Sequence, residues 1–362
     1  MRRILHCPGA ALVVLWALLY GGATPFATTA ASAAEKAAPA PHIALLLPLA
    51  SPSFGRHADA VKQGFLAAAK TSGAGAPPIR VYTVNEDTLN ILSTYEQAIE
   101  TGAQVVVGPL TRNGVAALAA SSLVSVPTLA LNTVDSRSPL PARLFLFGLG
   151  AEQEARQVAR LALDVSRRTA YMVGDNSPVS RRMRQAFIEE YARRGGRVIA
   201  EFTFTTDLPA LAKLRETTAL GTADIVFLAL DSPRARAIRP YLGNSLSLYG
   251  TSQVNSLAGT PVARELNLVH FVEMPWLLQP DHPAVMIYPR VDFGDAIDLV
   301  RLYALGIDAF RIGVELLGNN PDPSLDGVTG QIRLTRDQQF VRELPVARFL
   351  DDKTVVVARP RK

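Results

Sequence analysis

Cysteine is almost absent from this 362-residue chain, whose only cysteine is Cys7. It precedes an apolar stretch that has the features of a cleavable secretion leader, described below. Once that leader is removed the chain has no thiol, so it forms no disulfide and offers no thiol nucleophile or thiolate metal ligand. The folded protein must then be stabilised by the packing of its side chains.

The sequence also lacks the motifs of common catalytic sites. It contains no Gly-x-Ser-x-Gly, no phosphate-binding Gly-x-x-x-x-Gly-Lys-Ser/Thr and no Ser-x-x-Lys. Four histidines follow the leader, and no two of them have the four-residue spacing of a zinc-binding helix. They are His42, His57, His270 and His282. We therefore expect no catalytic residue, no metal site and no cofactor.

The first 33 residues have the parts of a secretory signal peptide. Arg2 and Arg3 precede an apolar core at residues 10–20, and Ala31-Ser-Ala33 fits a cleavage site. The core is shorter than the ~20 residues that a membrane span requires. We interpret the segment as a cleaved signal followed by a tether at 34–41, and we predict a periplasmic protein; a retained anchor is the alternative. Export makes nucleic acid an unexpected partner.

A strand, a loop and a helix recur between residues 42 and 252, with small polar residues directly after the strands. The apolar runs that predict strands are 43–49, 105–110, 127–132, 170–175 and 224–230. Amphipathic stretches such as 58–70 lie between them, with apolar residues at four-residue spacing. This alternation is typical of parallel sheets covered by helices, so we predict an α/β protein with doubly wound parallel sheets.

After residue 252 the alternation changes. We predict a connecting strand at 270–278 and a long helix at 295–318, followed by a β pair made of 327–334 and 342–349 and a last strand at 354–358. Together with a strand at 142–149 that ends the first set of units, this pattern predicts two lobes and three crossings between them.

The predicted domain division follows from these elements. The crossings form a three-strand hinge, and the long helix returns the chain to the first lobe. Lobe 1 is 42–148 plus about 279–325, lobe 2 is 149–270 plus about 326–358, and the hinge lies near 148–150, 271–278 and 321–327.

Nine motifs spread along the chain resemble one protein family. They are Ile43–Leu49, Val107–Leu110, Leu129–Asn132, Ala237–Pro240, Tyr249–Ser252, Glu273–Leu278, Leu302–Asp308, Asp326–Gly330 and Arg342–Pro345. The chain resembles the C-terminal domain of the penicillin-binding protein activator lipoproteins of the LppC/LpoA type, which has the type I periplasmic binding protein fold. The resemblance implies two lobes joined by three connections and a non-enzymatic activator of a penicillin-binding protein.

Two features depart from that family. Its members are outer-membrane lipoproteins, but Cys7 precedes the apolar core, where no lipobox places it, so an outer-membrane lipid anchor is not expected on this start. The longer members also carry a helical-repeat domain, whereas only the tether precedes residue 42 here. Roles that need the repeat domain are not transferred to this chain.

Polar residues at the strand ends predict a ligand cleft, because ligands of such sheets bind beyond the carboxyl ends of the strands. Hydroxyls, amides and helix N-termini satisfy a polar or carboxylate ligand there. Other roles stay open: Thr111 and Asp231 could cap helices, and Trp276 could pack in the core. The predicted cleft residues are Ser51, Ser53, Phe54, Thr111, Asn132, Thr133, Asp175, Ser177, Asp231, Thr251, Ser252 and Trp276.

Two functions remain open at this point. The first is a periplasmic regulator of peptidoglycan synthesis that activates a class A penicillin-binding protein, as the resemblance implies. The second is a solute-binding protein that delivers an amino acid or another small polar ligand to an ABC transporter permease. The same fold serves both, so fold alone does not choose. An apolar, filled cleft favours the regulator, and a polar, open cleft favours the receptor.

Overall fold

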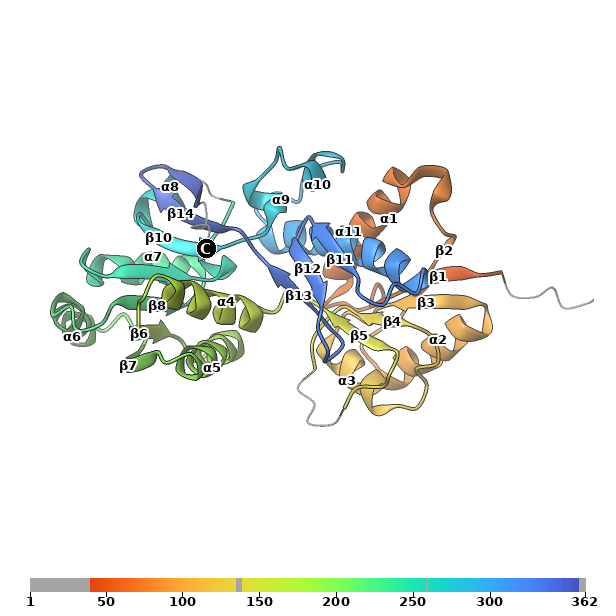
Figure 1. Ribbon diagram of the computed structural model, residues 1–362, viewed down its shortest axis with the longest axis horizontal. Coiled ribbons are helices and arrows are strands. Elements are labelled where there is room, and N and C mark those ends of the chain that lie inside the picture. Colours follow the sequence, from red (N-terminus) through yellow and green to blue (C-terminus); the bar gives the residue numbers. More distant parts are fainter. Residues whose placement is uncertain (1–39, 135–138, 258–259, 358–362) are drawn as a thin grey trace, which may run out of the picture. The chain divides into compact units, whose positions relative to one another are not determined.

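The computed structural model describes residues 40–134, 139–257 and 260–357 (Figure 1). The predicted signal peptide, Cys7 and most of the predicted tether lie outside these residues. Within the described ranges, none of the helices combines the length and apolar character needed to cross a membrane. The described chain forms two sheets in which most neighbouring strands are parallel, so the predicted fold class is confirmed.

The first sheet contains a strand, β1, that is buried along its whole length. Its strands are β1 (His42–Leu47), β2 (Ile79–Thr83), β3 (Ala103–Val107), β4 (Thr128–Ala130), β5 (Leu144–Phe147), β11 (Ser324–Gly327), β12 (Gly330–Leu334) and β13 (Gln339–Glu343). Their order is β11-β12-β13-β5-β4-β3-β1-β2. All six residues of β1 are buried, as expected for a strand covered by helices on both faces.

The first sheet and its helices form the first lobe. The helices are α1 (Gly55–Thr71), η1 (Gly73–Gly75), α2 (Thr88–Glu100), α3 (Arg112–Ala120), α9 (Pro275–Leu278), α10 (Pro283–Met286) and α11 (Ile297–Leu317). Helices α1 and α11 pack on one face of β1, against Ile43 and Leu45. Helices α2 and α3 cover the other face, against Ala44 and Leu46, because successive side chains of a strand point to opposite faces.

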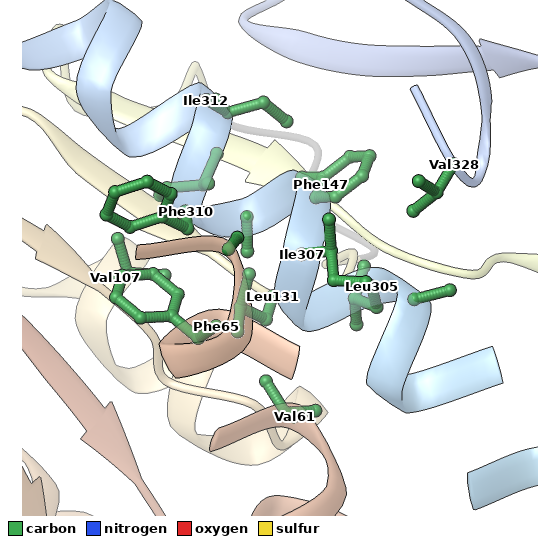
Figure 2. Packing of buried hydrophobic residues seen from close by; sticks show 14 of the residues in the cluster. Val61, Phe65, Val107, Leu131, Phe147, Leu305, Ile307, Phe310, Ile312 and Val328 are labelled. Atoms are coloured by element: carbon green, nitrogen blue, oxygen red, sulfur yellow. The ribbon is translucent and has the colours of Figure 1, made fainter. Parts of the chain in front are cut away.

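Helices α1 and α11 approach each other closely because glycines stand at their crossing. A Cβ atom on Gly64 would lie 1.9 Å from the carbonyl oxygen of Tyr303, and one on Gly306 would lie 2.1 Å from that of Val61. Figure 2 shows the apolar contacts beside this crossing, where the rings of Phe65 and Phe310 meet edge to face at 5.3 Å. The crossing fixes α11 on the first lobe.

The second sheet and its helices form the second lobe. The strands are β6 (Thr169–Gly174), β7 (Arg197–Thr203), β8 (Ile225–Ala229), β9 (Ser247–Gly250), β10 (Val269–Val272), β14 (Val346–Leu350) and β15 (Lys353–Val357), in the order β15-β14-β10-β9-β8-β6-β7. The helices are α4 (Ala151–Asp164), α5 (Pro178–Arg193), α6 (Leu208–Ala219), α7 (Ser232–Ile238), η2 (Arg239–Tyr241), η3 (Ser252–Val254) and α8 (Thr260–Glu265). Helices α4 and α5 pack on one face of this sheet, and α6, α7 and α8 pack on the other.

The chain passes between the two sheets three times, and the third passage differs from the prediction. The first lies between β5 and α4, and the second follows β10. The third is at Leu344–Pro345, between β13 and β14, so the hinge segment predicted near 321–327 is wrong. The hairpins β11-β12 and β12-β13 continue into the pairing of β13 with β5, which keeps the chain in the first sheet as far as Glu343.

Two predicted strands near these passages also differ from the structure. The strand expected at 270–278 ends at Val272, because Pro275 opens helix α9 at a position where its missing N–H is tolerated. The expected pairing of 327–334 with 342–349 is wrong. The second segment is divided by Pro345 between two sheets, and the partner of β12 is β13.

Candidate functional site

A cleft of about 580 Å³ is lined by residues of both lobes, beyond the carboxyl ends of the first-sheet strands. The first lobe contributes loop residues after β1 to β5 and one face of α11. The second lobe contributes the first turns of α4 and α5 and one residue of η3. The lining residues are Phe54, His57, Glu86, Leu110, Thr111, Arg112, Asn113, Leu131, Asn132, Leu149, Gly150, Ala151, Glu152, Val179, Arg182, Gln253, Asp298, Leu302 and Leu305.

Three of the predicted cleft residues line this cavity, and all three belong to the first lobe. They are Phe54, Thr111 and Asn132. Thr111 also caps α3, since its hydroxyl accepts a hydrogen bond from the N–H of Gly114 at 3.2 Å. Predicted Ser51 is buried behind the wall, where its hydroxyl accepts from the N–H of Phe54 at 2.8 Å and donates to the carboxylate of Glu86. Ser51 thus supports two lining residues from behind.

The predicted acids of the second lobe do not line the cavity. Asp175 and Asp231 both bind Arg234, whose Nε lies 3.3 Å from the Asp175 carboxylate. Asp231 also caps α7, since its carboxylate accepts from the N–H of Arg234 at 3.0 Å. In this arrangement both carboxylates already have a cationic partner on their own lobe.

The remaining predicted residues also lie outside the lining of the cleft. Ser53 and Thr133 are in loops of the first lobe, and Ser177 caps α5 by accepting from the N–H of Ser180. Trp276 is buried in the core of the first lobe, with the guanidinium of Arg290 4.0 Å above its ring. Thr251 and Ser252 are buried in the second lobe, where Thr251 caps η3.

The most strongly charged part of the cleft was missed by the sequence reasoning. Oε1 of Glu152 accepts from Nη2 of Arg112 at 2.9 Å and from Nε of Arg182 at 2.6 Å. Arg112 opens α3 in the first lobe, whereas Glu152 and Arg182 lie in the first turns of α4 and α5 in the second. The available signal was the position of Arg112 directly after the strand-end residue Thr111.

The surroundings of Glu152 keep its carboxylate ionised. Burial alone raises the pKa of Glu152, but the hydrogen bond from its own backbone N–H and the charges of Arg112 and Arg182 outweigh burial and lower the pKa below its usual value. The cleft therefore combines apolar walls with one ion cluster, an arrangement that suits recognition of a small molecule. Within the described part of the chain, no three His, Cys, Asp or Glu side chains gather as metal ligands would.

Comparison with known families places the chain in one of them. The family model described as "LppC putative lipoprotein" matches residues 24–351. The chain belongs to the LppC family. The family description is that of a lipoprotein, and curated relatives of the chain are named penicillin-binding protein activators.

Individual relatives of this LppC chain carry two kinds of name. "Penicillin-binding protein activator LpoA" of Yersinia pseudotuberculosis is 25% identical over 87% of this chain and 61% of its own length. The C-domain of LpoA from Haemophilus influenzae, described as "a regulator of PBP1A", superposes with a TM-score of 0.71 at 20% identity, covering 88% of this chain and all of that one. A "putative branched-chain amino acid ABC transporter" from Chromobacterium violaceum is 37% identical, with a TM-score of 0.73, and covers 85% of this chain and all of that one.

Because the match covers only part of each curated relative, the functions in the relatives' names cannot be assigned directly to this chain. This chain spans about half to three fifths of the length of the curated LpoA relatives that it matches. At 20% identity, the similarity to the Haemophilus influenzae domain shows a shared fold. The activity and partners of the whole relatives are therefore proposals for this LppC chain.

Beside the cleft, buried ion pairs join the two lobes of the LppC chain. Arg342 of β13 binds Glu154 of α4 at 3.3 Å, and Arg301 of α11 binds Glu273, which follows β10, at 2.6 Å. Ser252 joins the two pairs, since its N–H donates to Glu154 and its carbonyl oxygen accepts from Arg301. All four charged residues are at most 5% exposed. The two buried pairs therefore join a charge of one lobe to a charge of the other.

Proposed function

We propose that this protein is a non-enzymatic periplasmic regulator that binds a class A penicillin-binding protein and raises its peptidoglycan synthesis. The observation that carries the proposal is the family match over residues 24–351, together with curated relatives that are named penicillin-binding protein activators. The Haemophilus influenzae domain of the same fold is described as a regulator of PBP1A, which favours this class of synthase.

The contacts between the lobes support a role in docking a protein partner. The pairs Arg342–Glu154 and Arg301–Glu273 are buried and hydrogen-bonded, so separating the lobes would leave uncompensated charges. A partner that contacts both lobes would meet surfaces held in one relative placement, and less conformational freedom would be lost on binding.

The test is capture of a partner followed by an activity assay. The purified chain, immobilised and incubated with detergent-solubilised envelope of its own organism, should retain a class A penicillin-binding protein. Adding the chain to that purified synthase should then raise glycan polymerisation or crosslinking. Failure to raise either activity at saturating concentration would contradict the proposal.

A second candidate function is supported by a specific observation. The Chromobacterium violaceum structure, described as an amino-acid transporter component, is 37% identical, and this chain has a cleft between its lobes. A solute-binding protein would be retained with an ABC transporter permease, and amino acids would raise its unfolding temperature. Capture of a permease without a synthase would favour this candidate over the regulator.

The proposed compartment has its own test. The signal-like first 33 residues support export and cleavage after Ala33. Mass spectrometry of the protein from a periplasmic fraction should give an N-terminus at Ala34. An intact N-terminus in a cytoplasmic fraction would contradict export.

A further inference from the structure

The carboxylate of Glu152 lies in the cleft between two arginines, one from each lobe. Its Oε1 bridges Arg112 of the first lobe and Arg182 of the second, at 2.9 and 2.6 Å. The Glu152 side chain is 18% exposed and the two arginine side chains are 33% and 35% exposed, so solvent reaches the cluster. A glutamate side chain has enough rotatable bonds to leave this position while α4 stays in place.

The backbone around the two arginines also favours a negative charge. Thr111 to Asn113 form the N-terminus of α3, and Gly150 to Glu152 form that of α4, and both lie in the lining of the cleft. The first N–H groups of a helix lack partners within the helix and carry a partial positive charge. The two N-termini therefore add to the attraction that Arg112 and Arg182 exert on a carboxylate.

The other carboxylates of the lining have partners of their own. Glu86 accepts from the hydroxyl of Ser51, and Asp298 lies 3.1 Å from Nη1 of Arg301. Among the lining residues, Glu152 is the carboxylate that balances the two cleft arginines.

The rest of the cavity suits an apolar group of moderate size. Its volume of about 580 Å³ lies within the range of small-molecule sites, roughly 300–1,000 Å³. Aliphatic and aromatic side chains come from both lobes and from α11, which crosses behind the cleft. They are Phe54, Leu110, Leu131, Leu149, Val179, Leu302 and Leu305.

We propose that the cleft binds a small carboxylate with an apolar body, and that the ligand carboxylate replaces Glu152 between Arg112 and Arg182. Glu152 then acts as an internal competitor, which weakens binding until the ligand is abundant. The bound ligand would join the lobes through the same arginines that Glu152 joins now. This inference goes beyond the proposed function, since binding of a synthase does not require an occupant of the cleft.

Isothermal titration of the purified chain with 4-methylpentanoate and phenylacetate, and with their neutral amides, tests the proposal. The acids should bind and the amides should not. Glu152→Gln should bind the acids about tenfold more tightly, because the competing charge is removed, which corresponds to about 1.4 kcal/mol. Arg112→Gln and Arg182→Gln should each weaken acid binding by tenfold or more.

A matched control and a spectroscopic readout complete the experiment. Glu189→Gln removes an exposed carboxylate 4.0 Å from Arg156, outside the cleft, and should leave the affinities unchanged. The Nε–Hε signal of Arg182 should shift on addition of acid and stay in place with amide. If Glu152→Gln fails to fold, Glu152→Ala serves in its place and should also bind the acids more tightly than the wild type. Equal binding of acid and amide, or no binding of acid by any folded variant, would overturn the proposal.

Discussion

Asp308 shows how one buried carboxylate can connect elements that are distant in the sequence. It lies in α11 with no exposed surface, and it accepts hydrogen bonds from Val328 N–H at 3.1 Å and from the N–H and hydroxyl of Thr329, both at 2.7 Å. Nη1 of Arg311 lies 3.2 Å away. The carboxylate therefore holds the β11-β12 turn on the long helix.

Replacing Asp308 by alanine should destabilise the fold strongly. The substitution leaves two buried N–H groups without an acceptor, and each such loss costs about 1–3 kcal/mol. We expect a decrease of about 2–4 kcal/mol in the free energy of unfolding, measured by guanidinium denaturation. Asp337→Ala, at an exposed turn, is the control and should change stability by less than about 0.5 kcal/mol. Similar losses in both variants would refute the role of Asp308.

His270 should make stability depend on pH. Burial first, and then the charge of Arg348 opposite it on β14, lower the pKa of His270 below 6.5, while its ring stacks on Tyr249. A lowered pKa means that the unfolded chain takes up the proton first as pH falls. The contribution of neutral His270 to the free energy of unfolding is therefore fully present above about pH 6.5. It is lost as pH falls from there through the pKa of His270 in the folded protein.

His270→Phe, which keeps a ring beside Tyr249, should reduce this dependence. Unfolding temperatures measured between pH 5 and 8 should fall less steeply towards acid in the variant than in the wild type. Carboxylates contribute to both proteins equally at each pH, so the difference between the curves isolates His270. Parallel curves would show that His270 titrates alike in the folded and unfolded chains.

The capping roles of two predicted residues were accessible from sequence, and the ion cluster of the cleft was not. Thr111 and Asp231 stand directly before apolar-faced helices and have capping side chains, a local pattern that can be read from neighbours in sequence. Arg112, Glu152 and Arg182 are brought together by three helices of two lobes. Nothing local to each of them specifies the other two, so only the tertiary structure reveals the cluster.

Among the elements, periodicity predicted the alternation of strands and helices well, and proline explains the main errors. The long helix predicted at 295–318 matches α11 to within two residues, and the amphipathic stretch 58–70 lies within α1. Pro275 and Pro345 interrupt apolar runs that otherwise continue as strands. A run of apolar residues therefore predicts burial reliably, but the points where the backbone changes direction depend on single residues without an N–H.

Gly306→Ala should destabilise the crossing of α1 and α11. In an ordinary helix interior this change is favourable by about 1 kcal/mol, because alanine has the higher helix propensity. Here the new Cβ would lie 2.1 Å from the backbone oxygen of Val61, so the helices must move apart and the packing around Phe65 and Phe310 must loosen. We expect a net loss of about 1–3 kcal/mol in the free energy of unfolding.

Gly313→Ala in the same helix is the matched control. Its Cβ would meet a methyl group of Val107 at 3.2 Å, which a side chain can relieve by a small shift, so the variant should be neutral or mildly destabilised. Thermal unfolding of both variants distinguishes the two sites. A Gly306→Ala variant as stable as the wild type would mean that the helices adjust their separation at little cost.

At the scale of the whole molecule, each lobe supplies a charge to the buried core of the other. Buried pairs are weak evidence for stability when both partners are replaced together, but losing one partner leaves a charge without compensation. Arg342 is fully buried; it donates to the carbonyl oxygens of Gly148, after β5, and Thr329, in the β11-β12 turn, and it pairs with Glu154 of the second lobe. These contacts make the relative placement of the lobes depend on ionised groups.

Arg342→Met should therefore cost about 3–5 kcal/mol at pH 7, seen as a lower guanidinium midpoint. Burial raises the pKa of Glu154 even with Arg342 present, so without the arginine its carboxylate should take up a proton more readily. When the pKa of a group is raised in the folded protein, the group favours folding at low pH and disfavours it as pH rises. Arg342→Met should therefore destabilise the protein less at pH 5 than at pH 7.

The double variant Arg342→Met with Glu154→Gln decides whether the loss comes from the unpaired charge. Glutamine is neutral and keeps an oxygen for the N–H of Ser252, so the double variant should recover most of the stability and lose the added pH dependence. Arg236→Met, which breaks the exposed pair with Glu265, should cost less than about 1 kcal/mol. If the double variant is no more stable than Arg342→Met, then the loss comes from the hydrogen bonds of Arg342 to Gly148 and Thr329 within the first lobe, and not from the unpaired charge.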